Sequence, residues 1–301
     1  MKRSGMRRLA AFAAAAALVL CLVGCGGAQS AAQGNTEPVD LSVWTYYNGD
    51  QLESFNKLVD TFNDTVGKEK NITVESYSQG SVNDLEVQVM AAAQGKVGAS
   101  AMPNIFMAYA DTAYAMDQMG ELADLAPYFT DEERAAYVDS YLTEGDFDDS
   151  GSIKIFPVAK TTDAEVEASV VFLKWFTQPE NNIAFAVGSG YLPVTHAAND
   201  MDAIHSSGLA LTGSMENVLT EAVDAVNTNE LYTTKAFEGG TDARSKLNYS
   251  MSDLATADRA TVEERLAAGE SAEEAEAEFL TDAYFEAWYQ SLCDALSQYE
   301  G

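Results

Sequence analysis

The sequence predicts an α/β fold in which one parallel-type sheet is followed by a mostly helical region. Short apolar runs alternate with amphipathic helical patterns up to residue 158, and this alternation is typical of a parallel sheet with helices on its faces. Beyond residue 158 helical patterns dominate. The total of about five strands suits a single sheet and is too small for two full ones.

The first lobe is expected at residues 39–158. Apolar periodicity predicts strands at 41–47, 72–77 and 105–109, followed by helices at 52–66, 82–94 and 112–119. A helix at 130–142 and a strand at 153–158 complete this lobe. In open α/β sheets ligands bind at the carboxyl ends of the strands, so the polar turns after the first two strands, at 48–50 and 78–80, indicate a binding edge.

The remaining region, residues 159–301, is expected to be mostly helical up to its carboxyl-terminal helices. The predicted helices lie at 163–177, 180–187, 214–226, 242–254, 261–268 and 272–299, and the one further strand candidate lies at 231–237. Thr162 with Glu165, and Ser271 with Glu274, have the spacing of capping boxes. Cys293 falls on the apolar stripe of the last helix and is expected to be a small core residue.

The amino-terminal residues 1–24 predict an export signal, because four cations precede an apolar run of 15 residues, from Leu9 to Val23. That run is shorter than the roughly 20 residues that span a bilayer. The ending Leu-Val-Gly-Cys at 22–25 resembles the lipobox of bacterial lipoproteins, which implies a lipid on Cys25 and a place on the outer face of the cell membrane. Plain secretion is the alternative. Residues 25–38 are rich in small and polar residues and predict a flexible tether.

Charge and cysteine content exclude several classes of protein. The chain has 17 Lys and Arg residues against 47 Asp and Glu, a net charge of −30, and loss of the signal would remove four of the cations. Such a surface repels nucleic acid and anionic headgroups, so neither is expected as a partner. Only Cys25 and Cys293 would remain after signal removal, and no disulfide framework is predicted.

The residues proposed to contact a ligand follow the ends of the three early strands, where aromatic rings and polar groups occur together. They are Trp44, Tyr46, Tyr47, Asn48, Tyr77, Gln79, Tyr109 and Asp111. Flat rings match the apolar faces of sugar rings, while amides and carboxylates bond hydroxyl groups. The alternative for each ring is ordinary packing, since strand alternation would bury Trp44 or Tyr47 in the core.

Several short stretches resemble the extracellular solute-binding protein family 1, the sugar-capturing lipoproteins of ABC importers. They lie at 41–44 (Leu-Ser-Val-Trp), 103–106 (Pro-Asn-Ile-Phe), 154–157 (Lys-Ile-Phe-Pro), 172–181, 189–194 and 266–275. No single stretch is specific; their order along the chain and the lipobox carry the resemblance. It implies a type II periplasmic-binding-protein-like fold, a carbohydrate ligand, permease subunits as partners and a monomeric protein.

The resemblance also implies further ligand contacts and a missing segment. Thr161 and Tyr191 match positions that family members place at the cleft, and Arg244 lies in a late region where phosphate-binding relatives use an arginine; a surface ion pair is the alternative for Arg244. In the family a stretch of about one small domain separates the features that meet here between Lys160 and Asp163. The second lobe is therefore expected to be incomplete, and solute affinity is expected to be reduced.

Motifs of enzymes, metal sites and cofactor sites are absent from the sequence. The two histidines, His196 and His205, fit no zinc pattern, and Asp146 begins an apparent calcium loop whose twelfth position is Pro157 rather than glutamate. We therefore expect no catalytic residue, metal or cofactor. The alternatives to a sugar-binding protein are a binder of a glycerol-phosphate type solute, a surface glycan hydrolase with paired carboxylates, and a remnant that binds nothing.

Overall fold

A three-stranded parallel sheet lies at the centre of the computed structural model, which describes residues 37–232 and 235–299. Strand β1 (Val39–Thr45) pairs with β2 (Ile72–Ser78) on one side and with β3 (Ile105–Phe106) on the other. The parallel pairing confirms the predicted α/β class with a small parallel sheet. β3 is shorter than predicted. The hydrogen bonds to β1 end at Met107, directly after β3, whose N–H donates to Trp44 O at 3.1 Å.

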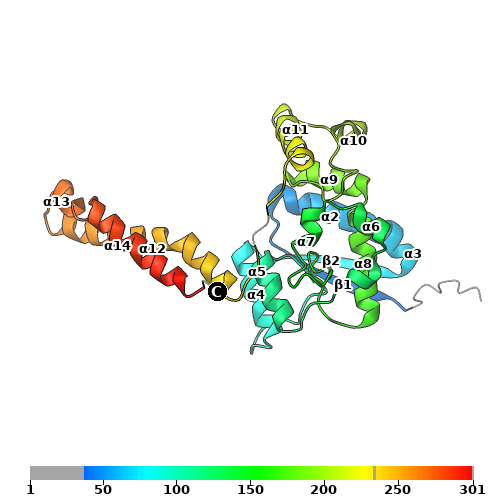
Figure 1. Cartoon of the computed structure of the whole chain (residues 1–301), viewed down its shortest axis with the longest axis horizontal. Coiled ribbons are helices and arrows are strands. Elements are labelled where there is room, and N and C mark those ends of the chain that lie inside the picture. Colours follow the sequence, from blue (N-terminus) through cyan, green and yellow to red (C-terminus); the bar gives the residue numbers. More distant parts are fainter. Residues whose placement is uncertain (1–36, 233–234, 300–301) are drawn as a thin grey trace, which may run out of the picture. The chain divides into compact units, whose positions relative to one another are not determined.

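Different helices cover the two faces of this sheet (Figure 1). On one face the side chains of β1 pack with α2 (Gly49–Phe62) and α8 (Asp163–Phe176). On the other face Trp44 packs with α4 (Val82–Ala93) and α5 (Ala110–Gln118). Val39, Leu41 and Val43 of β1 belong to the first cluster and Trp44 to the second, so the end of the central strand is buried on both faces.

The helix predicted at 52–66 continues beyond α2 through a π-helical segment, η1 (Asn63–Gly67), and a last turn, α3 (Lys68–Lys70). The side chain of Asn63 fixes this segment to the sheet, since it donates to Val74 O at 2.9 Å and accepts from Val74 N at 2.8 Å. π-helical turns of this kind occur as short, local irregularities inside α-helices.

The prediction of a strand at 153–158 is wrong. Within this segment only Val158 forms a bridge, to Ile105, and the other backbone contacts go to different parts of the chain, such as Leu125 N to Ile153 O at 3.0 Å. Pro157 has no N–H to donate, and β3 is too short to offer a continuous ladder. The segment therefore crosses the sheet edge as an irregular connection.

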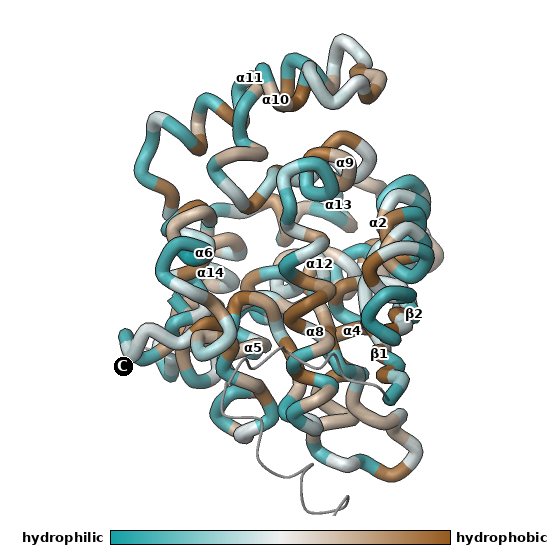
Figure 2. Tube along the Cα trace, turned by 90° about the vertical axis from the view of Figure 1, so that its right-hand side faces the viewer, coloured by the Kyte–Doolittle hydropathy of each residue, from teal (hydrophilic) through white to brown (hydrophobic). Residues whose placement is uncertain are grey.

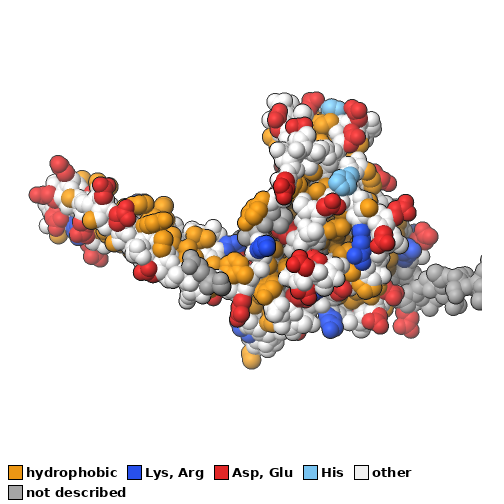
Figure 3. Space-filling model, viewed as in Figure 1, with side chains coloured by type: hydrophobic (Ala, Val, Ile, Leu, Met, Phe, Trp, Pro, Cys, Tyr) orange, Lys and Arg blue, Asp and Glu red, His pale blue; other side chains and the backbone are white. Residues whose placement is uncertain are grey.

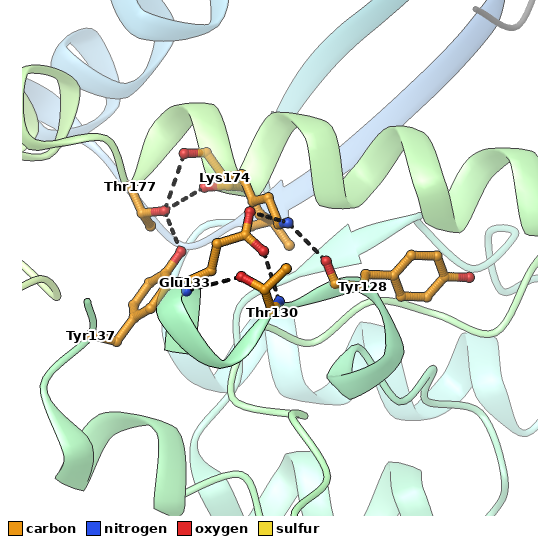
Figure 4. A network of polar contacts seen from close by, with 7 residues as sticks. Tyr128, Thr130, Glu133, Tyr137, Lys174 and Thr177 are labelled. Carbon is orange, nitrogen blue, oxygen red and sulfur yellow. Dashed lines mark hydrogen bonds and ion pairs between the residues drawn. The ribbon is translucent and has the colours of Figure 1, made fainter. Parts of the chain in front are cut away.

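The helix predicted at 130–142 is two short helices, α6 (Asp131–Ala135) and α7 (Asp139–Thr143), which follow a 3-10 turn, η2 (Ala126–Tyr128). Polar contacts join α6 to α8 (Figure 4). Glu133 closes a capping box with Thr130, and its carboxylate also accepts from Lys174 Nζ at 2.5 Å.

The hydrophobic core of the sheet extends past the lobe boundary that the sequence suggested near residue 158. Phe172 and Trp175 of α8, and Phe185 of α9 (Pro179–Ser189), belong to the same buried cluster as Leu41 and Val43 of β1. Brown, hydrophobic stretches mark these helices in Figure 2. Helices α8 and α9 thus complete the core of the first lobe. The predicted capping box of Thr162 and Glu165 starts α8 as expected.

The next two helices, α10 (Met201–Ser206) and α11 (Gly213–Thr228), bury a small cluster of their own against α9. Its members include Ile183, Ile204 and Leu219. Helix α10 was not predicted, because six residues are too few to show a clear apolar period.

The carboxyl-terminal part is helical, with α12 (Gly240–Ala267), α13 (Ala272–Glu276) and α14 (Asp282–Ser297). Helix α12 is continuous where two helices were predicted, and residues 272–299 are divided between α13 and α14. The core position predicted for Cys293 is wrong: Cys293 is partly exposed, and no described residue of α14 is buried.

Two further predictions depend on residues outside the described part. The signal at 1–24, Cys25 and the tether up to residue 36 lie there entirely. Of the strand predicted at 231–237, the described residues 231–232 and 235–237 are not in a strand.

No helix within the described residues is long and apolar enough to cross a membrane.

Candidate functional site

A cavity of about 300 Å³ lies where β1 and β3 end. Tyr46 and Tyr47 enter its wall directly after β1, and Met107 and Ala108 enter it directly after β3. Aromatic rings from several other parts of the chain complete the wall. They include Phe156, Phe176, Phe185 and Tyr191. Ligands of open α/β sheets bind at this edge, as the sequence predicted for the site.

The hydroxyl groups of Tyr46 and Tyr191 meet at this cavity, at an oxygen–oxygen distance of 2.8 Å. Burial, and then the hydrogen bond with Tyr191, raise the pKa of Tyr46 well above its usual range, so the Tyr46 hydroxyl is protonated at neutral pH. One hydroxyl donates to the other, which leaves one O–H free to donate to a bound molecule.

The ring of Tyr47 is buried and forms the inner part of the wall. Its centre lies 5.5 Å from that of Phe55, 5.4 Å from that of Phe185 and 6.0 Å from that of Tyr191. The rings of Phe185 and Tyr191 are nearly parallel, at an interplanar angle of 6°. Such contacts hold the rings in fixed orientations.

Two polar side chains in the wall make hydrogen bonds within the protein. Thr177 donates to Leu173 O at 2.8 Å and lies 2.7 Å from the hydroxyl of Tyr137. Asn182 accepts from Val194 N at 2.8 Å through Oδ1. No described residue that lines this cavity is Asp, Glu, His, Lys or Arg, and the described residues contain no cluster suited to a metal ion. The wall therefore offers binding surface rather than acid–base groups.

Trp44 does not lie in this wall, and its proposed ligand contact is corrected by the structure. The ring is 7% exposed and packs with Leu85, Phe106 and Met116 on the opposite face of the sheet. Strand alternation explains the difference: Val43 points to the cavity side and Trp44 to the other side.

Arg244, Asp111 and Tyr109 form a separate cluster. Arg244 Nε lies 2.8 Å from Asp111 Oδ2, its NH2 group lies 2.7 Å from Glu86 Oε2, and its guanidinium carbon lies 4.6 Å from the centre of the Tyr109 ring. An ion pair, the alternative considered for Arg244, is thus the arrangement found, and its partly buried groups link α12 to α4 and α5. Neither Asp111 nor Arg244 lines the aromatic cavity.

The other predicted ligand residues are spread over the surface. Tyr77 is exposed and donates to the carboxylate of Glu75, and Gln79 lies beside it on the turn after β2. Asn48 is exposed at the start of α2, and Thr161 is exposed before α8. Of the predicted residues, the structure brings Tyr46, Tyr47 and Tyr191 together in one cavity.

Sequence reasoning missed Phe156 and Phe176 as wall residues. Phe156 was assigned to a strand and Phe176 to a helix, and both are only partly buried. A signal existed for Phe156, because the following proline prevents a regular strand and leaves that side chain free to face the strand ends.

Comparisons with known proteins agree with this architecture. Residues 152–212 match the family model described as bacterial extracellular solute-binding protein, which agrees with the resemblance found in the sequence. Comparison with curated protein sequences finds no match.

Solved structures of other proteins are similar in fold, among them two with a TM-score of 0.50. The maltose/maltodextrin-binding domain of Bdellovibrio bacteriovorus, bound to maltotriose, has a TM-score of 0.50 and 9% identity, over 72% of this chain and 94% of that one. UgpB of Mycobacterium tuberculosis, in complex with glycerophosphocholine, has a TM-score of 0.50 and 11% identity. This match covers 71% of this chain and 93% of UgpB. A Thermus thermophilus maltotriose-binding protein is 21% identical to this chain, and the match covers 38% of this chain and 27% of the Thermus protein. Its TM-score is 0.29, so this likeness supports no conclusion about the fold.

Proposed function

We propose that the chain captures a small solute for an ABC importer, because residues 152–212 match the model of bacterial extracellular solute-binding proteins. The observation that carries the proposal is the aromatic cavity at the ends of β1 and β3. Its wall is preformed, its rings are held by mutual contacts, and it has one free hydroxyl donor. These are the usual properties of a small-molecule site.

The ligand that this wall favours is a neutral molecule with a ring, and a carbohydrate is the best candidate. The rings of Tyr46, Phe176 and Tyr191 offer flat apolar faces to sugar rings. A phosphate-bearing solute fits less well, since no described residue of the wall is cationic. Acidic side chains are also spread over the face seen in Figure 3, and they repel anions.

The proposal includes a reduced second wall. Two-lobed binding proteins enclose their ligand, and this chain passes directly from residues 160–162 into α8. A solute held against one wall keeps part of its surface in water, so we expect weak binding compared with an enclosed site.

The same proposal covers the cellular setting. The apolar run and the Leu-Val-Gly-Cys ending predict export and a lipid on Cys25, and residues 25–38 would then link that lipid to the fold. The protein would act as a monomer on the outer face of the cell membrane and pass its solute to permease subunits.

Isothermal titration of the mature protein with maltotriose tests the function. We expect saturable binding, and a Kd raised at least about tenfold in Tyr191→Ala, because the variant loses a ring of the wall and the hydroxyl partner of Tyr46. The matched control is Tyr232→Ala, since Tyr232 is 88% exposed and lines no cavity described above.

The other outcomes would each contradict the proposal. Cleavage of maltotriose during the titration would indicate a glycan hydrolase. Binding of glycerophosphocholine but not maltotriose would favour the phosphate-bearing class. Absence of binding to both would identify a protein that no longer captures solute.

A further inference from the structure

A second, more polar cavity adjoins the aromatic one. It has a volume of about 230 Å³ and shares the wall residues Ala108, Ile155 and Pro157 with the aromatic cavity. Its remaining wall includes Glu144 and Lys154. The aromatic cavity and a compartment that contains charged groups therefore lie next to each other, at these three residues.

Glu144 is the unusual member of this wall. It caps the carboxyl end of α7 and is partly buried, and its backbone N–H donates to Ser140 O at 3.2 Å. Within the described residues its carboxylate has no hydrogen-bond donor and no counter-ion, and burial raises its pKa. A carboxylate taken partly out of water without a partner destabilises the fold, so its position is unfavourable for the protein alone.

The backbone holds Glu144 in this place. A Cβ atom on the next residue, Gly145, would lie 2.1 Å from Ile155 N, so only glycine allows the end of α7 to lie directly against residues 154–155. This contact fixes the carboxylate beside the wall that both cavities share.

The cation of the same compartment is already paired. Lys154 Nζ lies 2.8 Å from Asp117 Oδ1, and the two side chains are 14% and 18% exposed. Arg244, which lies over the ring of Tyr109 at the compartment wall, is likewise paired with Asp111 and Glu86. Both cations are therefore occupied by other carboxylates, and the available group in this wall is an acceptor, the carboxylate of Glu144.

We propose that Glu144 is a solute-binding residue whose carboxylate accepts hydrogen bonds from hydroxyl groups of a neutral solute, while a ring of that solute lies in the aromatic cavity. The inference rests on the proposed function and assigns it a second contact point. Hydroxyl groups supply the donors that the carboxylate lacks, and a hydrogen bond to a charged acceptor is stronger than one between neutral groups.

Titration of maltotriose into Glu144→Ala and Glu144→Gln tests this role. We expect the Kd to rise about tenfold to a hundredfold in Glu144→Ala, which removes the acceptor, and by a smaller factor in Glu144→Gln, whose amide oxygen still accepts. Glu132→Gln is the matched control, because it removes the same charge from an exposed position on α6 and is expected to change the Kd by less than about twofold.

A second measurement separates a binding role from a structural one. The unliganded Glu144→Gln protein is expected to unfold at the same temperature as the wild type or higher, since a neutral amide replaces an unpaired carboxylate. A lower unfolding temperature would show that the carboxylate stabilises the fold and would overturn the inference.

The outcomes also separate this inference from the proposed function. If Tyr191→Ala weakens binding and both Glu144 variants bind as the wild type does, Glu144 is not a contact and the function stands. If the wild type binds no maltotriose, the proposed function fails and this inference fails with it.

Discussion

The hydroxyl groups of Tyr46 and Tyr191 lie 2.8 Å apart, although 145 positions separate the two residues in the chain. Tyr46 follows the central strand, and Tyr191 follows α9, which packs on α2. Their contact therefore depends on helices on the far side of the predicted lobe boundary. It joins the end of the sheet to the part of the chain that completes its core.

The first prediction concerns alkaline pH. The pKa of Tyr46 is raised in the folded protein, so its contribution to stability is complete below the unfolded value of 10.0 and is lost as pH rises beyond it. Denaturant unfolding at increasing pH should show this loss, and Tyr46→Phe should show less of it. An unchanged profile in the variant would mean that Tyr46 ionises freely in the folded state. Tyr232→Phe, at an exposed position, is the control.

The second prediction concerns Trp44, which packs in the core rather than the cavity wall. Trp44→Ala should lower the free energy of unfolding by about 3–5 kcal/mol, because it leaves a large cavity between the sheet and α4 and α5. The folded fraction should still bind maltotriose with about the wild-type Kd, within a factor of two. Selective loss of binding in a protein of normal stability would return Trp44 to the binding surface.

The third prediction concerns the link between α12 and the helices beside the sheet. Arg244→Ala leaves the carboxylates of Glu86 and Asp111 facing one another without a cation. We expect a loss of about 1–3 kcal/mol, less than for a fully buried pair. Hydrogen exchange should be faster in the first turns of α12.

Arg259→Ala is the control for this change, because Arg259 forms an exposed pair with Glu263 on the same helix. Such a pair is worth about 0.3–0.5 kcal/mol. Equal effects of the two substitutions would show that the link adds nothing beyond a surface ion pair.

The fourth prediction concerns acid pH. The hydrogen bond from Lys174 is the largest cause that lowers the pKa of Glu133 below its usual 4.5. The group therefore stabilises the fold above that pH, and this stabilisation is lost as pH falls through the lowered pKa. Glu133→Gln should be less stable than the wild type at neutral pH, and the difference should shrink on acidification. A difference that is constant with pH would exclude an ionic contribution. Thermal unfolding at a series of pH values measures it.

The fifth prediction concerns the close approach of Gly145 to the backbone of Lys154 and Ile155. Gly145→Ala should cost about 1–3 kcal/mol, because the added methyl group cannot fit without moving α7. Gly213→Ala is the control, since a Cβ atom there meets no atom within 4 Å. Unfolding in denaturant compares the two, and a neutral Gly145→Ala would show that the end of α7 moves freely.

Much of the fold was predictable because its signals are local. The apolar alternation of β1 and β2, and the capping boxes at Thr162 and Ser271, depend on residues close together in the chain. The parallel order followed from the helices between the strands.

The errors arose where long-range contacts override local pattern. Residues 153–158 have the composition of a strand, but their backbone partners are residues 105–106, 123 and 125, and Pro157 breaks the ladder. The continuous α12 was divided in the prediction because its polar sequence has no clear apolar stripe.

The candidate site was predictable in position but only partly in membership. The strand-end rule located the edge, and Tyr46, Tyr47 and Tyr191 do meet there. Which of two adjacent rings faces the cavity depends on the strand register, so Trp44 was misplaced. Glu144 had no local signal, because its position depends on the approach of α7 to residues 154–155.

The exposed turn at residues 160–162 separates two stretches that fold onto the same sheet. Because both stretches are anchored independently of the turn, an additional folded module spliced in at this point would leave the buried interior undisturbed. A fluorescent reporter inserted there is thus a practical design for a sensor built on this scaffold.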